Sequence, residues 1–106
     1  MGGGFYLGWA RVGEWLKYTV AVGETRNYVF NMRVANLGSG AQFRIEADGV
    51  DVTGPVSLPN TGGWETWQTI SVNVPLTQGQ RVLRLVMIKS NVENNGVGNY
   101  DYFSIQ

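Results

Sequence analysis

With 106 residues, the chain has the length of one domain that buries a single hydrophobic core. Its eight Lys and Arg residues are scattered and balanced by eight Asp and Glu residues, which argues against a nucleic-acid backbone or an anionic membrane as the partner. Histidine and cysteine are both absent, which excludes Ser-His-Asp and Cys-His catalysis, disulfides, and imidazole or thiolate metal sites, and leaves carboxylate chemistry or oxygen-ligated calcium.

Short stretches of alternating apolar and polar residues follow one another along the chain and predict β-strands. Asp48-Gly49 is the strongest hairpin signal between them, and no stretch shows a helical period or the ~20 apolar residues of a membrane span. The predicted strands cover residues 15–22, 27–34, 42–47, 50–52, 67–74, 81–88 and 99–105, with an edge-type segment between Pro55 and Pro59. Residues 81–88 alternate least and predict a central strand covered on both sides. This pattern predicts an all-β sandwich of two antiparallel sheets, a jelly roll rather than an immunoglobulin-like fold.

Two of the four tryptophans lie close together in the stretch Asn-Thr-Gly-Gly-Trp-Glu-Thr-Trp, residues 60–67. Trp67 leads into an alternating strand and is assigned to the core, as is Trp15. Trp64 follows Gly62 and Gly63 on a polar loop, where a large apolar ring is unusual unless it contacts a ligand or folds back over the core. Trp64 is therefore a candidate ligand-binding residue.

Four segments taken in order, residues 8–20, 60–67, 82–85 and 99–103, resemble a family 6 carbohydrate-binding module. Modules of the related family 35 are similar as well. The resemblance implies a jelly-roll β-sandwich that binds polysaccharide without catalysis. It also implies a single module, residues 1–106, that belongs to a larger secreted glycoside hydrolase and is therefore extracellular, although the chain contains no signal peptide.

The resemblance assigns roles to individual residues. Trp9 and Trp64 correspond to two rings that hold a sugar ring between them, and Asn99 corresponds to an amide that hydrogen-bonds sugar hydroxyls. Such a site matches a pyranose, which has apolar C–H faces and a hydroxylated rim. Each contact is weak, so a dissociation constant between micromolar and millimolar is expected, about −4 to −8 kcal/mol.

Further residues near these rings are candidates for the same site. Glu14 and Glu65 flank the rings and can accept hydrogen bonds from sugar hydroxyls, although a solvated carboxylate is the commoner case at such positions. Tyr6 is close enough in sequence to join the site, or packs in the core. Because no Arg or Lys cluster converges there, a neutral sugar polymer is expected, with xylan, cellulose-type chains and β-1,3-glucan left open.

The chain departs from the family pattern at its start, where the usual first strand with its acidic residues is missing. In the family those acids and a residue that corresponds to Asp101 hold a structural calcium ion, so only part of that ligand set is present here. The missing strand is also expected to leave an apolar edge or face uncovered, for example outside Val86 and Ile88. A second copy of the chain is a candidate to cover it, which predicts a homo-oligomer.

Two other classes of function stay open. A glycosidase needs two carboxylates across the sugar, for which Glu14, Glu65, Glu93 and Asp101 are available. No acid lies in an apolar stretch that would raise its pKa, which disfavours catalysis. A structural or protein-binding sandwich would instead use the exposed tryptophans as interface anchors.

Overall fold

The computed structural model describes the backbone of residues 2–7 and 10–106 and the side chains of residues 10–101 and 103–106. Nine β-strands run through this part of the chain, and it contains no helix, so no helix able to span a membrane occurs in it. The strands are β1 (Gly2–Leu7), β2 (Trp15–Val22), β3 (Arg26–Ala35), β4 (Gln42–Ala47), β5 (Val50–Asp51), β6 (Val56–Ser57), β7 (Gln68–Leu76), β8 (Gly79–Lys89) and β9 (Asn99–Ile105).

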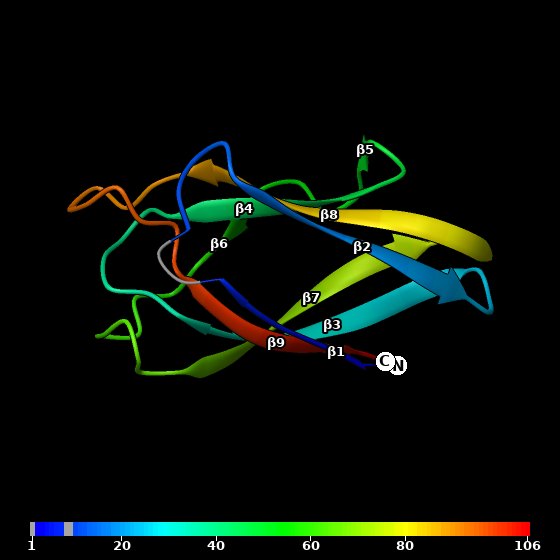
Figure 1. Ribbon diagram of the computed structural model, residues 1–106, viewed down its shortest axis with the longest axis horizontal. Helices are drawn as coiled ribbons and strands as arrows, with labels where there is room; N and C mark the ends of the chain where they lie inside the picture. Colours follow the sequence, from blue (N-terminus) through cyan, green and yellow to red (C-terminus); the bar gives the residue numbers. More distant parts are fainter. Residues whose placement is uncertain (1, 8–9) are drawn as a thin grey trace.

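The strands form two antiparallel sheets that pack face to face (Figure 1). One sheet has the order β1-β9-β3-β7, and the other has the order β2-β8-β4-β5, with β6 also paired to β4. The predicted all-β jelly-roll sandwich of two antiparallel sheets is thereby confirmed. β8 is a central strand, as its apolar sequence predicts. The prediction that it is covered on both sides is wrong, because Arg84 lies on its outer face, where it pairs in register with Lys17 and Glu46.

The core lies between the sheets and follows from the alternation of β3 and its neighbours. Phe30, Met32 and Val34 are at most 3% exposed, whereas the residues between them face outward. Phe30 stacks on Phe103 with ring centroids 5.7 Å apart. Each buried side chain of this size stabilises the fold by about 1.5–3 kcal/mol. Burial also raises the pKa of Tyr100 well above its usual 10.0, and its hydroxyl donates to the Val97 carbonyl at 2.8 Å.

The hairpin predicted at Asp48-Gly49 joins β4 to β5. Asp48 and Gly49 both have positive φ angles, 50° and 83°, and Ala47 pairs directly with Val50 across the turn. This backbone matches the right-handed twist of the two strands, which explains why the Asp-Gly dipeptide predicts it. Asp48 further accepts the Val82 N–H at 2.9 Å, so the turn is fixed to β8.

The core assignment of Trp15 and Trp67 is wrong. Trp15 is 50% exposed on the outer face of its sheet, where the Arg84 guanidinium lies 4.6 Å from the ring centroid. Trp67 is half-buried, directly before β7, with the Arg33 guanidinium 5.9 Å from its ring. Both tryptophans have the sequence parity of the outward-facing residues of their strands, because the inward positions are the even-numbered ones.

The uncovered face expected outside Val86 is also not where the sequence suggested. Val86 is only 8% exposed, and in the register of the sheet it lies between Trp15 and Arg44. These two long side chains shield it, since aromatic and guanidinium groups cover apolar neighbours with their stems and faces.

Candidate functional site

Four connecting segments meet at the left end of the sandwich in Figure 1: residues 10–14, 36–41, 58–67 and 90–98. Backbone hydrogen bonds join segments that are far apart in sequence. The Thr61 N–H donates to the Asn36 carbonyl at 2.8 Å, and the Val92 N–H donates to the Ser39 carbonyl at 2.8 Å. Ala10 is bonded to the last of the four segments, because its N–H donates to the Gly98 carbonyl at 3.0 Å. The four segments therefore form one continuous surface.

Buried side-chain amides hold this end together from within. Asn36 and Asn91 are 0% and 3% exposed, and each donates its amide to the side-chain oxygen of the other, at 3.1 and 2.8 Å. Asn36 also donates to the Pro59 carbonyl, and Asn91 also donates to Asn94 Oδ1. Because a buried amide is costly unless it is hydrogen-bonded, this network fixes the segments 36–41, 58–67 and 90–98 relative to one another.

Loop 58–67 has a local fold that follows from its sequence. Asn60 Oδ1 accepts the Gly62 N–H at 3.0 Å, which is the turn that an Asx residue forms with the residue two positions on. Gly62 has a φ of 90°, a conformation that side chains disfavour. The Thr61 hydroxyl donates to the Gly63 carbonyl at 3.0 Å and accepts the Asn36 N–H at 3.0 Å. These hydrogen bonds therefore fix the backbone that leads into Trp64.

Trp64 is half-buried and its ring lies against a glycine of the neighbouring loop. A Cβ atom on Gly96 would be 2.7 Å from Cη2 of the Trp64 ring, so only glycine permits this approach. Gly96 itself is held by its N–H, which donates to Asn94 Oδ1 at 2.8 Å. On the other side, the Asn99 amide donates to the Trp64 carbonyl at 2.7 Å. The indole is thus positioned by two segments besides its own.

Asn99 has a role that the sequence did not predict. It is the first residue of β9 and is only 6% exposed, and its amide nitrogen bonds the backbone of Trp64. The structure therefore brings together two of the predicted site residues, Trp64 and Asn99. A contact between Asn99 and sugar hydroxyls stays a prediction.

The other predicted ligand-binding residues differ in what the structure describes. Glu65 is exposed, beside Trp64. Glu14 is exposed too, and its carboxylate accepts the Arg11 N–H, which closes the turn before β2. Trp9 lies outside the described residues, and of Tyr6 only the backbone, in β1, is described.

The acidic side chains of the described residues do not gather into a group that could hold a metal ion. Asp101 pairs with Arg33 on the outer face of its sheet, with Oδ2 and Nε 3.6 Å apart. Among the described residues no three acidic, histidine or cysteine side chains lie close enough to hold a metal ion, and the chain has no acid outside them. Asp101 alone would supply at most two of the six to eight oxygens that calcium requires, so a calcium ion at Asp101 stays a prediction.

Glu93 also has a structural partner. Its carboxylate accepts the Ser39 N–H at 2.9 Å and the Ser39 hydroxyl at 3.0 Å, and these hydrogen bonds hold the pKa of Glu93 below its ordinary value. A catalytic acid needs a raised pKa, whereas the pKa of Glu93 is lowered, which disfavours that role.

Sequence reasoning missed the residues that support the site, namely Asn36, Asn91, Thr61 and Gly96. In the sequence, Asn36 lies between the strands predicted at 27–34 and 42–47, and Gly96 lies between those predicted at 81–88 and 99–105. Gly62 and Gly63 indicate a loop in the sequence, but the partner of Thr61 lies 25 residues away. No local pattern in the chain indicates such a contact.

Solved structures of similar fold show what class of protein this is. The C-terminal family 6 module of a marine laminarinase from Zobellia galactanivorans is similar, with a TM-score of 0.81 and 30% identity. The match covers 95% of this chain and 78% of that module. A β-1,3-glucan-binding family 6 module from Bacillus halodurans gives a TM-score of 0.78 at 28% identity, with 100% of this chain and 84% of that one covered. A module of Cellvibrio mixtus lichenase, solved with cellotriose, gives 0.78 at 27% identity, with 100% and 85% covered. The chain therefore has the fold of the carbohydrate-binding β-sandwich modules.

The family follows from the sequence match. The pattern of the family described as "Carbohydrate binding module (family 6)" matches residues 1–106, and the chain belongs to this family. A curated relative, a cycloisomaltooligosaccharide glucanotransferase of Niallia circulans, is 32% identical over 104 residues, which are 98% of this chain. The chain spans about a tenth of the length of that relative.

Proposed function

We propose that the chain binds a neutral polysaccharide or oligosaccharide by stacking a sugar ring between Trp9 and Trp64. The observation that carries the proposal is the position of Trp64 at the loop end of the sandwich. Its half-buried indole packs against Gly96, and the Asn99 amide donates to its backbone carbonyl. Ala10, the residue directly after Trp9 in the chain, is bonded to Val97 and Gly98, in the segment that also supports Trp64. This supports a common site for the two tryptophans.

The polar residues of the site suit the rim of a sugar. Glu65 and Glu14 are exposed acceptors, Asn99 adjoins Trp64, and Tyr6 is a further candidate contact. One similar module binds β-1,3-glucan and another was solved with cellotriose, which makes β-glucan fragments the first ligands to test here, followed by xylan. An acidic polymer is less suited, because the Arg33 and Arg84 guanidiniums lie against Trp67 and Trp15 on the sheet faces.

We also propose that residues 1–106 act as one module of a longer extracellular enzyme. Curated relatives of the chain include an endo-1,4-β-xylanase and an α-L-arabinofuranosidase of Cellvibrio japonicus, each 42% identical over 50 residues. In such a protein the module would hold the enzyme on its polymer. Neither a metal ion nor another cofactor is needed for this role.

The test is a titration of intrinsic tryptophan fluorescence with laminari-, cello- and xylo-oligosaccharides. The native chain is expected to give a saturable change with one series, with a dissociation constant between about 1 μM and 1 mM. Trp64→Ala is expected to abolish the change, since it removes one face of the stack. Trp64→Phe keeps a flat ring at the same place and is expected to bind more weakly but measurably.

A two-dimensional NMR spectrum of each variant provides the control, because a lost response counts only if the fold is retained. Binding that is unchanged in folded Trp64→Ala would contradict the proposed site. A native chain that responds to none of the sugars would instead favour the tryptophans as anchors of a protein interface.

A further inference from the structure

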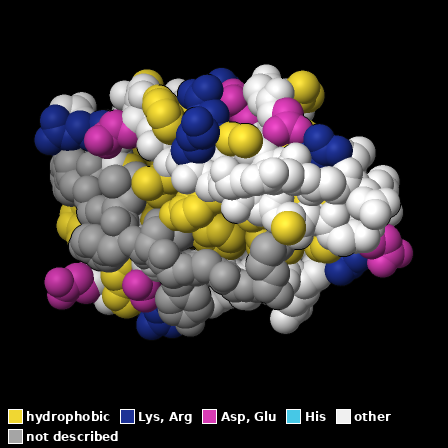
Figure 2. Space-filling view, turned by 45° about the vertical axis from the view of Figure 1, so that its right-hand side comes forward, with side chains coloured by type: hydrophobic (Ala, Val, Ile, Leu, Met, Phe, Trp, Pro, Cys, Tyr) yellow, Lys and Arg dark blue, Asp and Glu magenta, His cyan; other side chains and the backbone are white. Residues whose placement is uncertain are grey.

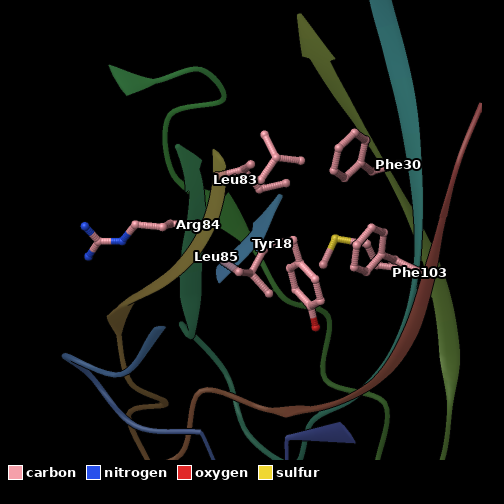
Figure 3. A pocket seen from close by; sticks show the side chains of 8 residues that line it. Tyr18, Phe30, Leu83, Arg84, Leu85 and Phe103 are labelled. Carbon is pink, nitrogen blue, oxygen red and sulfur yellow. The ribbon is translucent and has the colours of Figure 1, made fainter. Parts of the chain in front are cut away.

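The cavity between the two sheets is too small for a sugar ring. Tyr18, Leu85 and Phe103 point toward this cavity of about 20 Å³, while Arg84 points away from it (Figure 3). A cavity of that size holds about one water molecule. On the face shown in Figure 2, Lys and Arg side chains lie among Asp and Glu side chains around a hydrophobic middle, so this face presents no area of one charge to an ionic ligand. Affinity at the proposed site therefore depends on how the Trp64 ring is held at the surface.

Asn94 connects two loop segments through its side-chain amide. Its Oδ1 accepts the Gly96 N–H at 2.8 Å and the Asn91 side-chain amide at 3.1 Å, and its own amide donates to the Leu37 carbonyl at 2.8 Å. Two donors at the oxygen and an acceptor at the nitrogen determine which way the amide points. Asn94 thus joins segment 90–98 to segment 36–41 and to the buried amide network that holds both.

The Asn94 oxygen and the Trp64 ring approach Gly96 at the same place. A Cβ atom on Gly96 would be 3.0 Å from Asn94 Oδ1 and 2.7 Å from Cη2 of the Trp64 ring. The ring therefore lies on the part of the backbone that Asn94 holds through the Gly96 N–H. Van der Waals contact weakens steeply when a gap opens, so the ring follows any shift of this backbone.

We infer that Asn94 is a positioning residue of the sugar site, which acts through Gly96 on the Trp64 ring. The inference rests on the proposed function. With Oδ1 present, the Gly96 backbone and the ring on it share one position. Without it the Gly96 N–H loses its acceptor, and the segment can adopt other positions. A ring that is ordered before the sugar arrives loses less conformational entropy on binding, so Asn94 raises the affinity without touching the sugar.

Loss of Asn94 is expected to affect the ring more than the fold. Asn36 and Asn91 are at most 3% exposed, whereas Asn94 is half-buried and its hydrogen bond to Leu37 is exposed. Water replaces part of the lost hydrogen bonds at a surface position, which keeps the cost to the fold small. Asn94 thereby differs from the two buried amides, whose loss disturbs the whole loop end.

The experiment combines a sugar titration with an NMR measurement on the free chain. Asn94→Ala removes Oδ1, whereas Asn94→Asp keeps an oxygen acceptor for Gly96 and Asn91. An aspartate in this chain already makes such a turn, because Asp51 Oδ1 accepts the Gly54 N–H at 2.8 Å. With the oligosaccharide series that binds the native chain, the dissociation constant is expected to rise about two- to tenfold in Asn94→Ala and to return to within about twofold of the native value in Asn94→Asp.

The NMR measurement reports on the ring without any sugar. In Asn94→Ala the Gly96 amide proton is expected to exchange with solvent about two- to tenfold faster, because it has lost its acceptor. The indole N–H resonance of Trp64 is expected to shift, because the ring has moved. Asn94→Asp is expected to restore both signals. A role in overall stability alone would not give a change confined to Gly96 and Trp64.

Asp51→Ala is the matched control, because it removes the same kind of hydrogen bond elsewhere. Asp51 is an exposed residue of β5, and its Oδ1 accepts the N–H groups of Thr53 and Gly54 at 3.2 and 2.8 Å. The substitution is expected to leave the Gly96 and Trp64 signals and the sugar dissociation constant unchanged.

Gly96 and Trp64 signals that stay the same in Asn94→Ala would overturn the inference, and a weaker affinity would then indicate a direct contact between Asn94 and the sugar. Changed signals with an unchanged affinity would overturn it as well, as would an affinity that Asn94→Asp does not restore. If the native chain binds none of the sugars, the proposed function fails, and the two NMR signals still decide whether Asn94 positions the ring.

Discussion

The two ends of the sandwich are held by different means. At the loop end, neutral amides that are fully buried connect the long segments, with Asn36 and Asn91 at the centre. At the opposite end the turns are short and their polar contacts are exposed. There Arg81 pairs with Asp48 at 3.1 Å and also donates to the Gln78 carbonyl at 2.7 Å.

The difference shows how a loop surface is made rigid enough to bind. Exposed ion pairs contribute little to stability, because water and salt screen them. Buried amides contribute more to order, because each unmade bond leaves a desolvated group. An indole on such loops is already ordered before the ligand arrives, so less conformational entropy is lost on binding. Substitutions at matched positions of the two ends test this contrast.

The largest effect is expected for Asn36→Ala. The substitution removes the partner of the Asn91 amide and of the Pro59 carbonyl at a position that is 0% exposed. The free energy of unfolding is expected to fall by about 2–4 kcal/mol. Asn27→Ala, at an exposed asparagine of the other end, is expected to change it by less than about 0.5 kcal/mol. Urea denaturation of both variants measures the difference, and equal losses would refute the contrast.

A smaller loss of stability is expected for Thr61→Val. Valine keeps the shape of threonine but removes the hydroxyl that accepts the Asn36 N–H and donates to the Gly63 carbonyl. The expected cost is about 1.5–2 kcal/mol, because these groups are partly buried. Thr25→Val removes one exposed hydrogen bond, from the Gln78 N–H at 2.8 Å, and is expected to cost less than about 0.5 kcal/mol. Chemical denaturation is again the measurement, and a larger loss at Thr25 would reverse the comparison.

Gly96→Ala is expected to affect binding more than folding. The added Cβ would be 2.7 Å from the Trp64 ring, so the indole must move away from its position. Sugar affinity is expected to fall about tenfold, which corresponds to about 1.4 kcal/mol. Gly23→Ala is the control, since a Cβ there meets nothing within 4 Å and neither glycine has a positive φ angle. Unchanged sugar affinity in folded Gly96→Ala would show that the position of the Trp64 ring does not determine binding.

The sequence predicts the sandwich because a strand has a period of two residues and a hairpin needs particular turn residues. Both signals are local, which is why the strands from Arg26 to Ala35 and from Asn99 to Ile105 and the Asp48-Gly49 turn were found. The core assignment of Trp15 and Trp67 is wrong because both residues have the parity of the outward-facing positions of their strands.

The binding site was predictable only in part, for a related reason. Trp64 was found because an aromatic ring after two glycines is a local anomaly. The supporting residues Asn36, Asn91 and Gly96 are ordinary loop residues in sequence, and their function arises from partners in other loops. The energetics of a buried amide depend on those distant partners, so no sequence window contains the information.

The smallest effects are expected from the acids at the two ends, Asp48 and Glu93, and they concern pH. The Val82 N–H and the Arg81 side chain hold the pKa of Asp48 below its ordinary value, as the Ser39 groups do for Glu93. A carboxyl with a lowered pKa in the folded state stabilises the fold above its unfolded pKa of about 4, and this contribution is lost as the pH falls through the folded pKa.

Asp48→Asn is therefore expected to lower the urea midpoint at about pH 6, and its difference from the native chain is expected to shrink as the pH falls through the folded pKa of Asp48. Glu93→Gln should show the same convergence. Added salt should shrink the effect of Asp48→Asn more, because part of that effect comes from the exposed Arg81 guanidinium, whereas Glu93 is held by neutral Ser39 donors. Equal salt sensitivity in the two variants would mean that the ends do not differ in how they hold their acids.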